Sequence, residues 1–193
     1  MLNKLIEIIL SLILLLPVFC LLHKYRFHDA RKTIWCFLFA GYLAAVYLFV
    51  GLPTLQFMRF ELSVTLIPFL PMAADLKNTI LNVFLFVPLG ILAPFLWKKY
   101  STLKSTVLLG FVLSLAIELL QIFTYRATDI NDLIANTLGA GFGYLIFRMA
   151  SRRFPSMAKF ANVENEVPIL ILSVLVPMFF LQPYLATLYY AIF

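Results

Sequence analysis

The chain has 193 residues, of which 63% are hydrophobic and only 12% are charged, and its formal net charge is +6. A soluble domain carries about a quarter charged residues, so this composition excludes an ordinary soluble protein. With a mean hydropathy of +0.99, it indicates a membrane protein. The basic residues fall in alternating loops between apolar segments, a pattern that does not indicate nucleic-acid binding.

Six apolar segments of about 20 residues are each long enough to cross a hydrocarbon core of ~30 Å. They cover residues 2–22, 33–52, 78–97, 103–124, 129–150 and 168–190. The first has no small-x-small cleavage pattern, so it is expected to remain as a helix. The longest linker, residues 53–77, is too short to build its own core. The predicted fold is all-α, a polytopic transmembrane bundle of about six helices.

Basic residues are divided unevenly between the two sets of loops, eleven against four. The larger set is Lys24, Arg26, Arg31, Lys32, Lys98, Lys99, Lys104, Arg148, Arg152, Arg153 and Lys159. The positive-inside rule places these loops in the cytoplasm and both termini outside. We expect a multi-pass protein in three parts: an N-terminal hairpin with an outer loop (1–65), a core of three helices (66–150), and a cytoplasmic loop with the last helix (151–193).

Polar side chains gather at the ends of three predicted helices, all on the extracytoplasmic side of this topology. The candidate ligand-binding residues are Asn82, Glu118, Gln121, Arg126, Asp129, Asp132 and Asn136. At about 1.5 Å per residue, they fall within roughly 10 Å of the outer interface. Polar groups are costly in hydrocarbon unless they find partners, so this cluster is the predicted functional site.

Helical spacing places the cluster on two stripes. Glu118 and Gln121 share a face with Gly110 and Ser114, at steps of three and four residues. The following helix repeats the pattern with Asp129, Asp132, Asn136, Gly139 and Gly143. Small residues at such spacing let helices approach closely, so both stripes are expected to face the bundle interior.

A purely structural interpretation competes for part of this cluster. Thr128 or Asp129 can cap the helix that follows, and a carboxylate there suits the helix dipole. Arg126 can pair with Asp129, Asp132 or Glu118 and hold the hairpin closed. Glu118 lies about two turns from its helix end, too deep for such a cap, so it is expected to be protonated, paired with Arg126 or in contact with a polar ligand.

Four motifs follow one another in order along the cluster. They are N-x-x-x-F-x-P-x-G at 82–90, E-x-x-Q at 118–121, D-I-x-D at 129–132 and N-T-x-G at 136–139. Together they resemble the VanZ-like family, and Leu66-Ile67-Pro68-Phe69 resembles the Pro-Phe element that precedes them. The resemblance spans residues 66–144. It implies a protein of the bacterial cell membrane associated with resistance to the glycopeptide teicoplanin, and it implies no established reaction.

Three functions are compatible with these residues. The first is recognition of a lipid-linked or lipophilic envelope molecule by the outer cluster. The second is an intramembrane carboxylate-based hydrolase or transferase, for which Glu118 is the best catalytic candidate because of its depth. The third is a transporter or flippase, although no inverted repeat is evident. Membrane lipids and a possible second copy of the chain are the other expected partners.

Cofactor and metal sites are not indicated. His23 and His28 lie in a predicted cytoplasmic loop, Cys20 and Cys36 have no surrounding motif, and carboxylates alone are a weak metal signal. The proline-rich stretch at 66–71 is too short to span, and we expect it to form an interfacial or re-entrant cap over the cluster.

Overall fold

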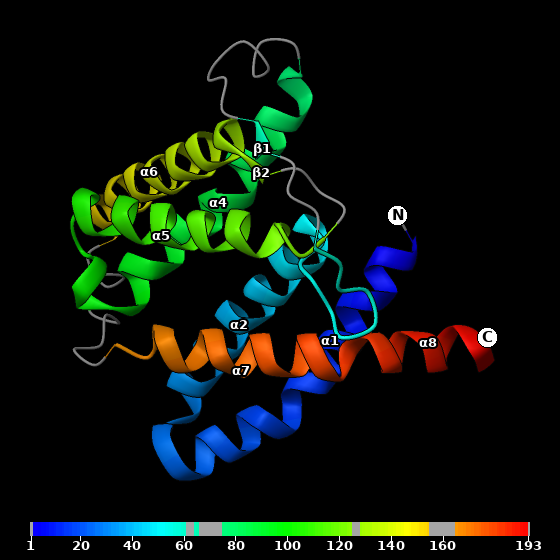
Figure 1. Cartoon of the computed structure of the whole chain (residues 1–193). Helices are drawn as coiled ribbons and strands as arrows, with labels where there is room; N and C mark the ends of the chain where they lie inside the picture. The colour runs from blue at the N-terminus through cyan, green and yellow to red at the C-terminus, as the bar shows by residue number, and fades with distance from the viewer. Residues whose placement is uncertain (1, 61–63, 66–74, 125–127, 155–164, 193) are drawn as a thin grey trace. The chain divides into compact units, whose positions relative to one another are not determined.

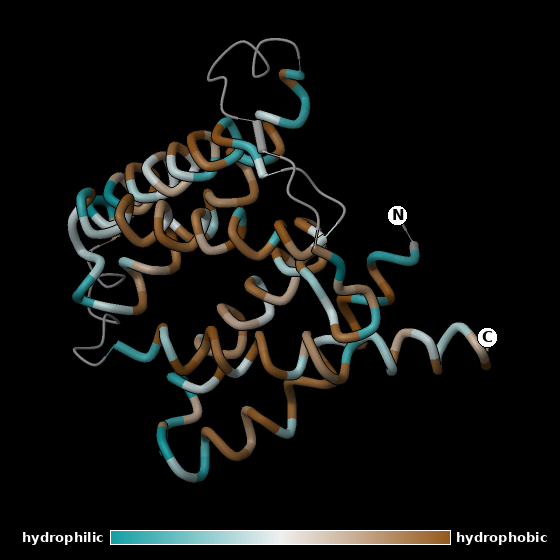
Figure 2. The backbone as a smooth tube through the Cα atoms, viewed as in Figure 1, coloured by the Kyte–Doolittle hydropathy of each residue, from teal (hydrophilic) through white to brown (hydrophobic). Residues whose placement is uncertain are grey.

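The computed structural model describes residues 2–60, 64–65, 75–124, 128–154 and 165–192. It confirms the all-α class (Figure 1). Within these residues, five helices are long and apolar enough to cross a bilayer, and a bent pair forms up to one further span. Hydrophobic residues run along the helices, whereas hydrophilic ones gather at helix ends and turns (Figure 2). The side of the membrane on which the termini lie remains a prediction.

The chain divides into two compact units. The first combines residues 1–59 with residues 166–193, and the second comprises residues 60–165. The first unit contains α1 (Leu2–Leu22), the π-helical turn η1 (His23–Phe27), α2 (Ala30–Val50), α7 (Val167–Phe180) and α8 (Gln182–Ile192). The second contains β1 (Val64–Thr65), α4 (Leu76–Leu96), the 3₁₀ turn η2 (Lys98–Tyr100), α5 (Leu103–Gln121), β2 (Thr128–Asp129) and α6 (Ile130–Arg153). The three-part division expected from the sequence stays a prediction.

In the first unit, a tight turn joins α1 to α2. His28 adopts the left-handed conformation with a φ of 53° and ends η1. Asp29 then caps α2, because its Oδ1 accepts a hydrogen bond of 3.0 Å from the Arg31 amide. The helix therefore begins at Ala30, a few residues before the apolar run that predicted it.

The last predicted span, over 168–190, is built from two helices with a bend between them. α7 and α8 meet at an angle of 46°. Pro183 lacks an amide hydrogen, so it cannot donate to the Phe179 carbonyl one turn earlier. The Leu55 amide takes that place and donates to the Phe179 oxygen at 3.1 Å. A connecting loop thus satisfies the carbonyl that the proline leaves open.

In the second unit, α6 packs against both α4 and α5. The α4–α6 crossing is close enough for backbone contact. A Cβ atom built on Gly90 would lie 2.1 Å from the Ala140 carbonyl oxygen, and one built on Gly143 would lie 2.1 Å from the Val87 carbonyl oxygen. This confirms that the small residues of the α6 stripe face a neighbouring helix.

A short parallel pairing was not anticipated by sequence reasoning. β1 pairs with β2 in the register Val64↔Thr128 and Thr65↔Asp129. It ties the segment after the first unit to the start of α6. The cap predicted at 66–71 lies outside the described residues.

Candidate functional site

Glu118 lies at the centre of the candidate site, on the buried face of α5. Its side chain is 3% exposed. One carboxylate oxygen, Oε2, accepts a hydrogen bond of 2.8 Å from the backbone amide of Asp129. The Glu118 carbonyl oxygen accepts a second bond, of 2.9 Å, from the Thr128 hydroxyl. Glu118 therefore connects the end of α5 to the residues that start α6, although it lies too deep to cap its own helix.

Asp129 is the N-cap of α6, as the structural interpretation predicted. Its Oδ1 accepts hydrogen bonds from the Asn131 amide at 2.8 Å and from the Asn131 side chain at 2.7 Å. The same residue presents its own amide to Glu118. Cap and buried carboxylate thus form one continuous polar chain across the α5–α6 junction.

Asn136 and Ser114 form a second link between α5 and α6, one level deeper. The Asn136 Nδ2 group donates to the Ser114 hydroxyl oxygen at 2.9 Å, and both side chains are buried. Among the described residues, the Asn136 Oδ1 atom is shielded from solvent and has no hydrogen-bond partner. Interhelical hydrogen bonds of this kind contribute about 0.6–2 kcal/mol in membranes.

The remaining predicted residues are placed differently. Gln121 is 4% exposed and lies on the same face of α5 as Glu118. Asp132, in the first turn of α6, and Asn82, in α4, are partly buried. Within the described part of the chain, no hydrogen bond joins Asn82 to Glu118 or Asn136. Arg126, and with it the predicted clasp, lies outside the described residues.

The start of α4, before Asn82, is held by a cap of its own. Asp75 caps α4, and its two carboxylate oxygens accept bonds from the Asn78 amide at 3.2 Å and from the Asn78 side chain at 2.8 Å. Asn78 is exposed there, so it belongs to the helix start. Among the predicted site residues, those for which side-chain hydrogen bonds are described (Glu118, Asp129 and Asn136) belong to α5, β2 and α6.

The chemistry available at this junction is hydrogen bonding by carboxylates, amides and hydroxyls. Carboxylates are present in Glu118, Asp129 and Asp132. In the described part of the chain, no group of three His, Cys, Asp or Glu side chains is arranged to hold a metal ion.

An ion pair in the first unit was missed by sequence reasoning. Lys32, assigned there to a cytoplasmic loop, forms a salt bridge with Glu166 just before α7. The Glu166 side chain is 1% exposed and that of Lys32 is 16% exposed. The available signal was the pair of acidic residues, Glu164 and Glu166, just before the predicted helix that starts at Pro168.

The hydrogen bond between Glu118 and the Asp129 amide leads to a stability prediction. Glu118→Leu leaves that amide without an acceptor, so it should lower the free energy of unfolding by about 1–3 kcal/mol. Glu118→Gln keeps a carbonyl oxygen in the same place and should lose less. Thermal unfolding of the purified protein in detergent distinguishes the two. Equal losses would mean that the hydrogen bond does not hold the junction.

The chain is similar in sequence to a known protein family and to a described protein. The sequence model of the VanZ/LLP1 family matches residues 8–152. Protein VanZ of Enterococcus faecium is 33% identical over 114 residues, which cover 58% of this chain and 69% of that protein. No solved structure matches the chain.

Proposed function

The chain belongs to the VanZ/LLP1 family, and we propose that it acts at the outer face of the bacterial cell membrane. In this proposal it is a multi-pass protein that recognises a lipid-linked or lipophilic envelope molecule and contributes to tolerance of glycopeptides such as teicoplanin. The membrane-length helices and the family match support the general part. The site at the α5–α6 junction supports the specific part.

The observation that carries the proposal is a difference in solvent exposure between the polar residues of the junction. Glu118, Gln121 and Asn136 are at most 4% exposed, so they form the buried part of the junction. Asp129 and Asp132 begin α6 and are only partly buried. A ligand arriving at the end of the bundle would therefore contact the α6 carboxylates first. The buried residues hold these carboxylates in position.

This position suits an amphiphilic ligand. The junction lies where two helices of membrane-spanning length end and begin, which is the level of lipid head groups. There a polar head can contact Asp129 and Asp132 while an apolar chain stays in the hydrocarbon. An entirely water-soluble ligand would gain nothing from this placement.

Susceptibility to teicoplanin and vancomycin in a sensitive Gram-positive host tests the proposal. We expect the wild-type protein to raise teicoplanin tolerance. Asp132→Asn should return tolerance to the level of the empty vector, because it removes the accessible charge while conserving shape. Asp75→Asn is the matched control, since that carboxylate caps α4 outside the junction. Immunoblots of membrane fractions verify that the variants are present at equal levels.

Two results would contradict the proposal in different ways. If Asp132→Asn and Glu118→Gln both protect as well as the wild type, the junction carboxylates are structural and the site assignment is wrong. If the wild-type protein gives no protection at equal membrane levels, the glycopeptide role fails for this chain, while its fold and family remain.

A further inference from the structure

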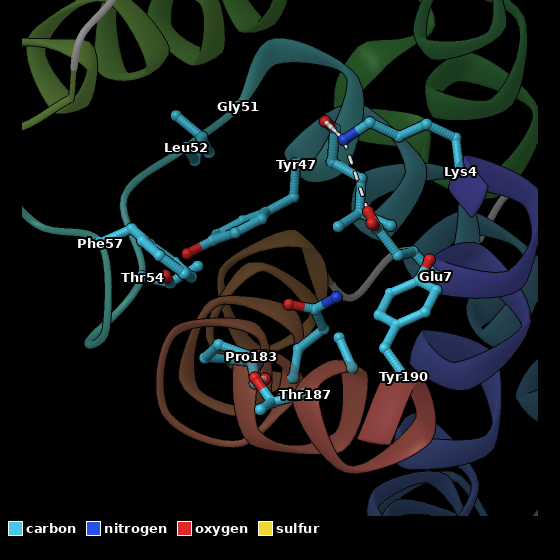
Figure 3. Close-up of a pocket in the computed structure, with 13 residues that line it drawn as sticks. Lys4, Glu7, Tyr47, Gly51, Leu52, Thr54, Phe57, Pro183, Thr187 and Tyr190 are labelled. Atoms are coloured by element: carbon cyan, nitrogen blue, oxygen red, sulfur yellow. Dashed lines mark hydrogen bonds and ion pairs between the residues drawn. The ribbon is translucent and has the colours of Figure 1, made fainter. Parts of the chain in front are cut away.

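A cavity of about 360 Å³ lies within the first unit, apart from the α5–α6 junction. It is formed by the start of α1, the end of α2, the loop after α2 and residues along α8 from Gln182 to Tyr190. Figure 3 shows Glu7, Tyr47 and Tyr190 around it. This volume is within the range of small-molecule sites, which are about 300–1,000 Å³.

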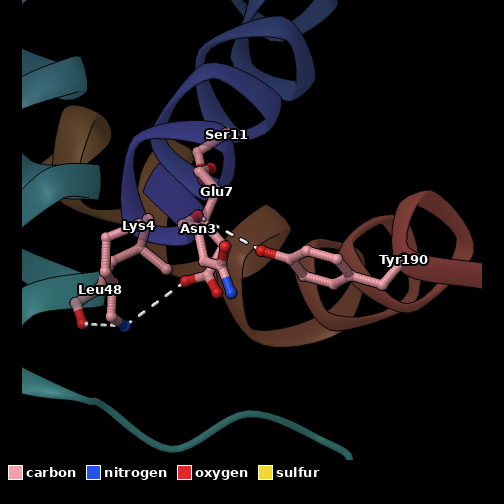
Figure 4. Close-up of polar contacts among 6 residues, drawn as sticks. All are labelled: Asn3, Lys4, Glu7, Ser11, Leu48 and Tyr190. Atoms are coloured by element: carbon pink, nitrogen blue, oxygen red, sulfur yellow. Dashed lines mark hydrogen bonds and ion pairs between the residues drawn. The ribbon is translucent and has the colours of Figure 1, made fainter. Parts of the chain in front are cut away.

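Hydrogen bonds bring three helix ends together beside this cavity (Figure 4). The Lys4 ammonium donates to the Leu48 carbonyl oxygen at 3.1 Å, joining the start of α1 to the end of α2. The Tyr190 hydroxyl donates to the Asn3 carbonyl oxygen at 3.4 Å, joining α8 to α1. Because α1 and α2 are both of membrane-spanning length, the cavity lies where the spans end, at head-group level.

The polar wall of the cavity carries one charge of each sign. Lys4 and Glu7 form a salt bridge of 3.4 Å, and their side chains are 50% and 21% exposed. A pair this exposed contributes little to stability, about 0–1 kcal/mol, so its two ions can exchange partners at low cost. A ligand with a single net charge would leave one of the two without an opposite charge.

Neutral polar groups complete that wall. Gln182 is 5% exposed, and Thr187 lies one turn further along α8. The Thr54 hydroxyl oxygen is shielded from solvent and has no hydrogen-bond partner among the described residues. Buried hydroxyls without partners are uncommon, because each costs about 1–3 kcal/mol, and a bound polar group would satisfy this one.

The apolar part of the lining comes from α8 and from the loop after α2. Leu52, Phe57, Pro183 and Ala186 form it. The loop that carries Leu52 and Phe57 is held by the bond from the Leu55 amide to the Phe179 carbonyl and by the bond from the Tyr47 hydroxyl to the Pro53 carbonyl. The cavity therefore combines a pair of opposite charges with apolar side chains on an anchored loop and on α8.

We propose that this cavity binds a zwitterionic head group that carries an ammonium and a phosphate. The ligand's ammonium pairs with Glu7, and its phosphate pairs with Lys4 and accepts hydrogen bonds from neighbouring hydroxyl and amide groups. The apolar side chains contact the carbon atoms next to the head group. The site is independent of the junction proposed above, because none of the junction residues lines it.

Native mass spectrometry of the full-length protein in detergent tests this assignment. Phosphatidylethanolamine should be retained about tenfold more tightly than phosphatidylglycerol, because the anionic lipid leaves Glu7 unmatched. Glu7→Gln should abolish that preference, whereas Lys4→Met should weaken the binding of both lipids, because it removes the partner of the phosphate that they share. Lys24→Gln, a change of charge outside the cavity, should preserve it. Soluble phosphoethanolamine is added as a competitor; displacement of the lipid identifies the free head group as sufficient, and retention identifies the intact lipid as the ligand.

A second variant separates binding from folding. Thr54→Val removes the buried hydroxyl without changing charge, and it should weaken phosphatidylethanolamine binding without lowering the temperature of thermal unfolding. The proposal is overturned if both lipids are retained equally, or if Lys24→Gln removes the preference as fully as Glu7→Gln does. Loss of glycopeptide tolerance has no bearing on this result, so the two proposals fail separately.

Discussion

Gly143→Ala is expected to lower the free energy of unfolding by about 3 kcal/mol, near the upper end for overpacked sites. The added Cβ would lie 2.1 Å from the Val87 carbonyl oxygen and 2.8 Å from the Gly90 Cα atom. Both neighbours are backbone atoms of α4, so no side-chain rotation can relieve the overlap. The helices must separate, and unfolding in detergent by heat or denaturant should report it.

Gly141→Ala is the matched control on the same helix. Its Cβ would lie 3.5 Å from the Val107 Cγ2 atom, an ordinary contact distance. Because alanine favours a helix over glycine by about 1 kcal/mol, this variant should be as stable as the wild type or more so. If both glycine variants lost stability equally, close α4–α6 packing would not be the reason for glycine at 143.

Glu166→Leu is expected to destabilise the protein by about 3–5 kcal/mol, because it leaves the mostly buried Lys32 ammonium without its carboxylate. The Glu166 side chain is 1% exposed, so water cannot take over the lost interaction. Lys32→Met should cost a similar amount by leaving the carboxylate unmatched. Equilibrium unfolding of the two single variants and the wild type measures both.

The double variant Lys32→Met, Glu166→Leu provides the critical comparison. Well-packed apolar residues can replace a buried ion pair at little cost, so the double variant should recover most of the stability that each single variant loses. Glu7→Gln, which breaks the more exposed pair with Lys4, should change stability by less than about 1 kcal/mol. Additive losses in the double variant would show that the two side chains do not act as a pair.

Local sequence signals predicted the helices and the placement of several candidate residues. The apolar run at 2–22 coincides with α1. Steps of three and four residues correctly placed Ser114, Glu118 and Gln121 on one buried face of α5. Asp129 was recognisable as a cap because capping depends only on the few residues around it. In each case the pattern and its structural consequence lie within a few turns of the same helix.

Long-range partners could not be predicted in the same way. Lys32 and Glu166 are distant in sequence, and no pattern in the residues around either one indicates that the two form a pair. The break after Phe180 depends on Pro183, yet prolines also occur within α4, which continues through Pro88 and Pro94. What differs at the break is the Leu55 amide that binds the open carbonyl, and its position follows only from the tertiary structure.

The division of the first unit between the two ends of the chain has a consequence for biogenesis. At typical synthesis rates, the ribosome needs on the order of ten seconds to pass from Lys32 to Glu166. During that interval α2 enters the bilayer before its partner carboxylate exists, and Lys32, near the start of the helix, can reach head groups and water. The continuous second unit can assemble meanwhile. Once α7 is inserted, the Lys32 ammonium can exchange its contacts with head groups and water for the salt bridge with Glu166. The final helices therefore complete the first unit.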